Sequence, residues 1–198
     1  MFRFRRALPL ILALLLLPLS LQACTPPPPP DDFAYAEGAF SASVRGTYPP
    51  AGDGEGAPRS FAAQITAGAP VAGDPTLRNL SVTFTAPEAL AGVTVTATLS
   101  PASEGTVTRT VTFTYPSDYG KVQATAESGA LGGLLRFAEA LLPIGDVTEI
   151  SPTAPDGSFS VTRQRGARVA TFSFAGEGTH PLGVTLSDGR GTVTLTVK

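Results

Sequence analysis

The chain has 198 residues, of which 42% are hydrophobic and only 15% are charged, and it contains no tryptophan. Its single cysteine excludes an intramolecular disulfide, and its single histidine excludes a metal site built on two histidines. The 14 basic and 16 acidic residues give a formal net charge of −2, which argues against nucleic-acid binding because that function requires a clustered basic face.

The first 23 residues have the composition of a signal peptide. A short segment with arginine at positions 3, 5 and 6 precedes an apolar run from Ala7 to Leu21. A membrane-spanning helix needs about 20 apolar residues, so this run is too short, and two prolines interrupt it. We therefore interpret residues 1–23 as a signal peptide and not as a transmembrane helix.

The end of this segment, Leu21-Gln22-Ala23-Cys24, resembles the lipobox of bacterial lipoproteins. The resemblance implies cleavage before Cys24, a thioether-linked lipid on its sulfur, and acylation of the new N-terminus by a fatty acid such as palmitate. Two or three acyl chains give a stable membrane anchor. Ordinary signal-peptide cleavage beside an incidental cysteine is the alternative.

Residues 24–35 are predicted to form a tether. Pro26–Pro30 are five consecutive prolines, which form a stiff polyproline II spacer of about 15 Å. The resemblance to lipoproteins implies a location in the bacterial cell envelope. An aspartate after the lipidated cysteine would imply retention in the inner membrane. Because Thr25 stands there instead, the outer membrane is the expected location if two membranes are present. Cleavage removes all three leader arginines, so the mature side chains carry a net charge of about −5 and should not bind anionic surfaces.

From residue 36 onward, apolar and polar residues alternate in short runs. This alternation predicts strands with one buried face, and the half-polar pattern favours an antiparallel all-β fold. Clear examples are Phe61, Ala63 and Ile65; Leu80, Val82 and Phe84; Val93, Val95 and Ala97; and Val193, Leu195 and Val197. Glycine- and proline-rich breaks between the runs predict turns.

One helix is predicted within this β region, over about residues 129–142. Leucine and alanine recur there at helical spacing, at Leu131, Leu134, Leu135, Ala138, Leu141 and Leu142. Ser128 is a candidate N-cap, and Arg136 and Glu139 have the spacing of a surface ion pair. We expect the helix to cover an open end of the β structure.

The segment from Ala167 to Val197 resembles the closing strands of bacterial Ig-like and PKD-like domains, including an Asp188-Gly189 turn before a threonine-rich strand. The resemblance implies an antiparallel Ig-like β-sandwich with one inserted helix. Residues 36–198 are expected to be one β-sandwich region, or two small sandwiches divided near residues 116–128.

No constellation of catalytic residues is present in the sequence. The only histidine, His180, adjoins Pro181, and there is no Gly-x-Ser-x-Gly nucleophile motif. The carboxylates at Asp53, Asp74 and Asp156 have turn neighbours. We expect no enzyme activity, cofactor or metal, with a hydrolase built on paired carboxylates as the remaining enzymatic alternative.

The expected function is therefore that of a membrane-anchored envelope lipoprotein with a structural, adhesive or assembly role and a protein partner in the envelope. The alternative is an accessory module that binds a ligand or glycan for a transporter or enzyme. Candidate surface residues for a partner or ligand are Tyr115 and Tyr119, which flank a loop, and Leu131 and Leu135 on the predicted helix.

We predict that Cys24→Ala abolishes incorporation of labelled palmitate and releases the protein from the membrane fraction, because the substitution removes the sulfur to which the lipid is attached. Cell fractionation and acyl labelling measure both effects. A variant that stays in the membrane with its label would contradict the lipoprotein interpretation.

Overall fold

The computed structural model describes residues 33–48, 57–101, 107–117, 120–126, 132–176 and 180–198. The predicted signal peptide, Cys24 and the proline run lie outside these residues. Tyr119 and Leu131 also lie outside them.

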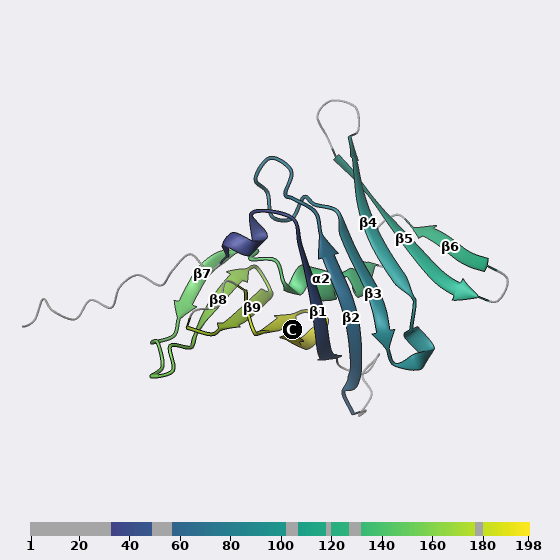
Figure 1. The fold of residues 1–198 in the computed structure, drawn as a ribbon. Coiled ribbons are helices and arrows are strands. Elements are labelled where there is room, and N and C mark those ends of the chain that lie inside the picture. The colour runs from purple at the N-terminus through teal and green to yellow at the C-terminus, as the bar shows by residue number, and fades with distance from the viewer. Residues whose placement is uncertain (1–32, 49–56, 102–106, 118–119, 127–131, 177–179) are drawn as a thin grey trace, which may run out of the picture. The chain divides into compact units, whose positions relative to one another are not determined.

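Eleven antiparallel strands form one sheet in the order β6-β5-β4-β3-β2-β1-β11-β10-β9-β8-β7 (Figure 1). The elements are η2 (Ala34–Ala36), β1 (Phe40–Tyr48), β2 (Arg59–Ala67), β3 (Leu80–Ala86), η3 (Glu88–Leu90), β4 (Thr94–Pro101), β5 (Val107–Ser117), β6 (Gly120–Ala126), α2 (Gly132–Ala140), β7 (Asp146–Ile150), β8 (Phe159–Arg165), β9 (Arg168–Phe174), β10 (Gly183–Asp188) and β11 (Gly191–Val197). The sheet consists of two meanders, β1–β6 and β7–β11, which are joined where β1 pairs with β11.

The prediction of an Ig-like β-sandwich is wrong. All eleven described strands belong to one open sheet, and β9, β10 and β11, which resemble the closing strands of a sandwich, are neighbours in it. Alternation shows that each strand buries one face, but it does not show what covers that face. A second sheet and a curved single sheet around a helix both satisfy the pattern.

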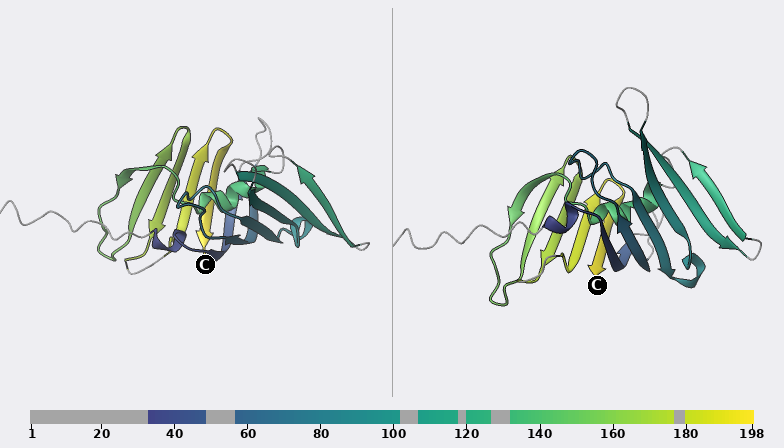
Figure 2. Two further views of the ribbon diagram at one scale, coloured as in Figure 1. Left: turned by 90° about the horizontal axis from the view of Figure 1, so that it is seen from above. Right: turned by 45° about the horizontal axis from the view of Figure 1, so that its top comes forward.

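The helix α2 lies against the apolar face of the sheet, where its buried side chains join those of the strands in one core. Strands β6 and β7 are consecutive in the chain but lie at opposite edges, so the segment that contains α2 has to cross between them. At about 4.8 Å per strand, a flat sheet of this size would be nearly 50 Å wide, whereas nine helical residues span about 14 Å. The sheet curves, and α2 lies within the curve (Figure 2).

The predicted alternation is confirmed in the core. The inward residues of the central strands are buried, including Phe61, Ala63, Ile65, Leu80, Val82, Phe84, Val95, Ala97, Phe172, Leu186, Val193 and Leu195. The outward residues between them are largely serine and threonine. Hydroxyl pairs connect neighbouring strands there, with Thr83 and Thr94 at 3.1 Å and Thr162 and Thr171 at 3.1 Å.

Phe137 of α2 is the centre of an aromatic cluster. Its ring centroid lies 4.2 Å from that of Phe61, 5.9 Å from that of Phe84 and 5.8 Å from that of Tyr48. Gly46 makes room for this cluster, because a Cβ there would lie 2.8 Å from Cε1 of Phe61 and 2.6 Å from the Thr194 carbonyl oxygen. Phe137 does not belong to the predicted apolar face, yet it is 4% exposed.

The helix therefore differs from its prediction in extent and surroundings. Its described part covers Gly132–Ala140, so it ends two residues before the predicted end at Leu142, and the predicted start with Ser128 lies outside the described residues. The sheet curves around it, so residues on several of its faces are buried, Arg136 among them. The predicted surface pair between Arg136 and Glu139 is wrong, because Arg136 pairs with Asp188 of β10 and Glu139 pairs with Arg109 of β5.

We predict that Phe137→Ala lowers the free energy of unfolding by about 3–5 kcal/mol, since it leaves a cavity between α2 and the sheet. Chemical denaturation followed by circular dichroism measures the loss. Val147→Ala is the control, because Val147 is 47% exposed on β7 and its truncation should cost less than about 1 kcal/mol. Equal losses in the two variants would contradict the central role of Phe137.

Candidate functional site

An apolar cavity lies between η2, the start of β1, the segment after α2 and the C-terminal end of β11. Its volume is about 140 Å³. The apolar part of the lining comes from Tyr35, Phe40, Ala42, Leu141, Pro181, Leu182 and Val197, and the polar part from Ser41, His180 and Lys198. An apolar cavity of this size is large enough for a benzene-sized group or a short hydrocarbon segment.

Tyr35 closes one side of the cavity. Its hydroxyl donates a hydrogen bond of 2.5 Å to the carbonyl oxygen of Leu141, which follows α2. Its ring makes edge contacts with the rings of Phe40 at 5.2 Å and His180 at 5.6 Å. Burial raises the pKa of Tyr35, and this outweighs the opposing effect of Arg78 and Arg163. The side chain is therefore a neutral phenol that connects η2 to the end of α2.

Arg78, fully buried beside β3, fixes the position of η2. Its Nη2 donates a 2.6 Å hydrogen bond to the carbonyl oxygen of Ala36, and its Nε donates a 3.1 Å bond to that of Pro75. The guanidinium lies 6.0 Å from the centre of the Phe40 ring. Burial lowers the pKa of Arg78, while Tyr35 acts in the opposite direction. Sequence reasoning missed this residue, because its acceptors are backbone carbonyls brought together only by the fold.

The opening of the cavity combines apolar and polar groups. Leu182 is 54% exposed beside it, and His180, Ser41 and Lys198 supply imidazole, hydroxyl and ammonium groups. The lining can hold an apolar chain or ring, and the polar groups at the opening can contact a polar end of the same molecule.

The aspartates that the sequence offered as candidate acidic residues stabilise turns. Asp74 accepts hydrogen bonds from the backbone N–H and the hydroxyl of Thr76, and these bonds lower the pKa of Asp74. Asp156 accepts the same pair of bonds from Ser158, with the same effect on its pKa. Asp53 lies outside the described residues. Among the described residues, no group of three or more histidine, cysteine or acidic side chains is arranged to hold a metal ion.

Two of the four predicted surface residues lie within the described residues, and they differ in exposure. Tyr115 is 44% exposed on β5, whereas Leu135 is 1% exposed and packs between α2 and the sheet. Tyr119 and Leu131 lie outside the described residues. Neither Tyr115 nor Leu135 lines the apolar cavity. His180, which the sequence singled out only as the one imidazole, does line it.

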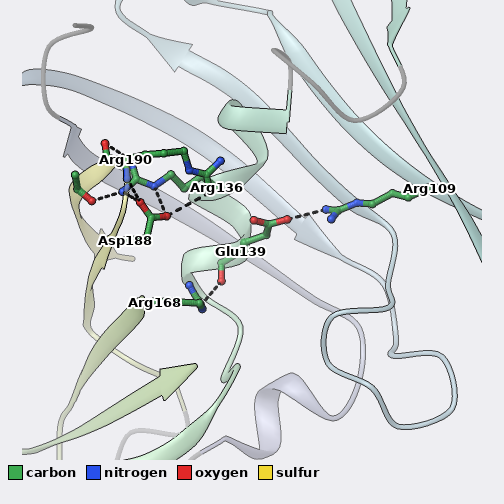
Figure 3. Close-up of polar contacts among 7 residues, drawn as sticks. Arg109, Arg136, Glu139, Arg168, Asp188 and Arg190 are labelled. Carbon is green, nitrogen blue, oxygen red and sulfur yellow. Dashed lines mark hydrogen bonds and ion pairs between the residues drawn. The ribbon is translucent and has the colours of Figure 1, made fainter. Parts of the chain in front are cut away.

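A second group of polar residues attaches α2 to the sheet (Figure 3). Arg136 donates to both carboxylate oxygens of Asp188, at 3.1 and 2.8 Å, and to the carbonyl oxygens of Arg190 and Gly191. Arg190 also contacts Asp188, at 3.2 Å. On the other side of α2, Arg109 pairs with Glu139 at 2.9 Å.

Asp188 is ionised in this environment. Burial acts to raise its pKa, but the backbone N–H of Arg190 and the charges of Arg136 and Arg190 outweigh that effect, so the pKa is lowered. The side chains of Arg136 and Asp188 are 8% and 13% exposed. A pair this sheltered from water is strongly destabilised when one partner is removed.

In the part of the chain that the structure describes, no helix is both long and apolar enough to cross a membrane. The sequence matches no protein-family model and no curated protein. Solved structures that cover most of the chain are similar to it at low identity. They include the lipoprotein LppX of Mycobacterium tuberculosis (16% identity, TM-score 0.39, covering 84% of this chain and 90% of LppX).

Two further solved structures have the same TM-score of 0.39. A LolA superfamily protein from Nitrosomonas europaea is 11% identical and covers 82% of this chain and 84% of its own. A DUF1329 family protein from Desulfovibrio piger is 8% identical and covers 85% of this chain and 86% of its own. No function is transferred from proteins at this distance.

We predict that Asp188→Asn lowers the free energy of unfolding by about 3–5 kcal/mol at pH 7, because it leaves the Arg136 charge buried without a carboxylate. The folded-state pKa of Asp188 is depressed, so its stabilisation is full above the ordinary carboxylate pKa and is lost as the pH falls through the folded value. The difference between the two proteins should therefore shrink below about pH 4. Urea denaturation at pH 7 and pH 3 measures it.

Arg190→Gln is the matched control, since the side chain of Arg190 is 57% exposed and its pair with Asp188 should contribute less than about 1 kcal/mol. A difference for Asp188→Asn that is independent of pH would show that the lost carboxylate charge is not the cause.

Proposed function

We propose that the protein is a lipid-anchored, non-enzymatic protein of the bacterial cell envelope that binds the apolar part of an amphipathic molecule. The lipobox-like segment ending at Cys24 supports the anchor, with the outer membrane as its location if the cell has two membranes. The apolar cavity beside Tyr35 and Leu141 is the observation that carries the binding function.

The dimensions of the cavity restrict the ligand. A volume of about 140 Å³ holds only part of a lipid-sized molecule, so a hydrocarbon end would insert and the remainder would leave through the opening. Each CH₂ group that leaves water contributes about 0.8 kcal/mol, so even a short inserted segment gives measurable affinity. The exposed polar residues Ser41, His180 and Lys198 also line the cavity and can contact a polar end of the ligand.

A structural or assembly role is the second candidate, and the edge strand β7 favours it. All five residues of β7 are exposed, including the apolar Val147 and Ile150, and β7 pairs only with β8. An exposed edge of this kind can accept a strand from a partner through main-chain hydrogen bonds.

We predict that a fatty acid carrying a photoactivatable diazirine labels the full chain in native membranes at Leu141 or Leu182, and that Ala42→Phe abolishes this labelling. The phenyl ring would occupy the cavity that the half-buried Ala42 lines. Mass spectrometry of the labelled peptides locates the crosslinks.

Ala62→Phe is the matched control, because Ala62 is a half-buried alanine on the adjacent strand β2 that does not line this cavity. Labelling that persists in Ala42→Phe, or that is spread evenly over the surface, would overturn the proposed binding site. Reproducible crosslinks from β7 to another envelope protein, together with no cavity labelling, would support the assembly role instead.

A further inference from the structure

Strand β7 is an exposed edge of the sheet, beside β8 (Figure 1). All five of its residues are exposed, and among the described strands it pairs only with β8. The main-chain groups of Ile150 are available at this edge. Ser151, the next residue, donates its N–H to the carbonyl oxygen of Ser160 in β8. Because main-chain groups alternate in direction along a strand, the N–H and C=O of Ile150 point away from β8.

A register shift in β7 sorts its side chains between the two faces of the sheet. Val147 and Ile150 are three residues apart and would lie on opposite faces of a regular strand. The shift between Val147 and Glu149 instead places both apolar residues beside the inward residues of β8, and it places Asp146 and Glu149 beside the outward ones. Val147 and Ile150 are nevertheless 47% and 44% exposed, so the described residues leave the inner side of β7 largely uncovered.

The outer side of β7 carries two carboxylates that have no basic partner in the described part of the chain. Neither Asp146 nor Glu149 takes part in an ion pair there. The residues of β8 that lie opposite them are Gln164 and Thr162, which are uncharged. A second copy of the same edge would bring like charges together, which destabilises strand pairing. A strand with basic residues at these positions would form cross-strand charge pairs instead.

We propose that β7 accepts an extended segment of a partner protein in which apolar and basic residues alternate. The segment pairs with the free main-chain groups of Ile150, its apolar residues cover Val147 and Ile150, and its basic residues lie beside Asp146 and Glu149. The inference rests on the assembly role proposed for β7 and adds the chemistry of the partner. Charges protect many sheet edges from pairing. Here they lie on the outer side alone, so they repel an identical edge and attract a basic one.

Isothermal titration calorimetry of the full-length chain in dodecyl maltoside tests the proposal with a capped nine-residue peptide of alternating lysine and valine. This peptide should bind, whereas an alternating glutamate and valine peptide should not. A peptide with the same lysines and valines in two blocks should bind more weakly. The double variant Asp146→Asn/Glu149→Gln should raise the Kd of the lysine peptide roughly fivefold to twentyfold, since two cross-strand charge pairs are lost. Glu88→Gln, at an exposed carboxylate in η3, is the matched control and should leave the Kd unchanged.

Two variants of Ile150 test the main-chain part of the proposal. Ile150→Pro and Ile150→Ala both lose the aliphatic side chain, but only the proline variant loses the N–H. Proline is tolerated in an edge strand where the N–H faces solvent. Ile150→Pro should therefore abolish binding and Ile150→Ala should only weaken it. If Ile150→Pro does not fold, the double carboxylate variant decides. Equal binding by the two Ile150 variants, or equal binding of the lysine and glutamate peptides, would overturn the proposal.

Two further measurements distinguish the other occupants of this edge. Multi-angle light scattering without peptide detects pairing with a second copy. A dimer that Ile150→Pro converts to a monomer would overturn the basic partner in favour of that copy. Crosslinks in cells from β7 to a segment of an envelope protein that is not basic would also overturn the partner chemistry, while they would leave the assembly role of β7 in place.

Discussion

The segment between β6 and β7 has to connect opposite edges of the sheet, and the apolar side chains of its helix α2 direct it across the apolar face. This constraint places α2 inside the curve, where Phe137 contacts the rings of Phe61 and Phe84. The same crossing carries Arg136 to Asp188 and Glu139 to Arg109. A helix in this position is buried on several sides, and its charged residues are satisfied by partners from the sheet.

Two hollows of the surface depend on where α2 ends. Leu141 lines the apolar cavity and accepts the hydrogen bond from Tyr35, while Glu139 lines the hollow beside Arg168 and Arg190. They also use opposite ends of β10, because Leu182 precedes this strand and Asp188 ends it. The apolar cavity and the hollow are thus separate surfaces that the same helix end helps to form.

Alternation predicted the strands around Phe61, Leu80 and Val193 but not β6, β7 and β8, and the predicted arrangement of the strands was wrong. Alternation is a local property, so the buried faces around Ile65 and Val82 follow from it. The pairing of β1 with β11 joins distant parts of the chain, and no local pattern records it. Phe137 was missed because a one-faced helix was assumed. Arg78 and Arg168 were missed because their acceptors are backbone carbonyls that only the folded chain brings together.

The attachment of the first described residues has a mechanical consequence. The Phe33 ring lies 5.0 Å from that of Phe172 and 5.5 Å from that of Phe174, and Arg78 holds Ala36. The next strand, β1, is paired on both sides, along its full length with β2 and at Val44–Thr47 with β11. Tension on the preceding chain therefore acts first on these contacts and then on a central strand that is hydrogen-bonded to two neighbours. An edge strand would be held by one neighbour only.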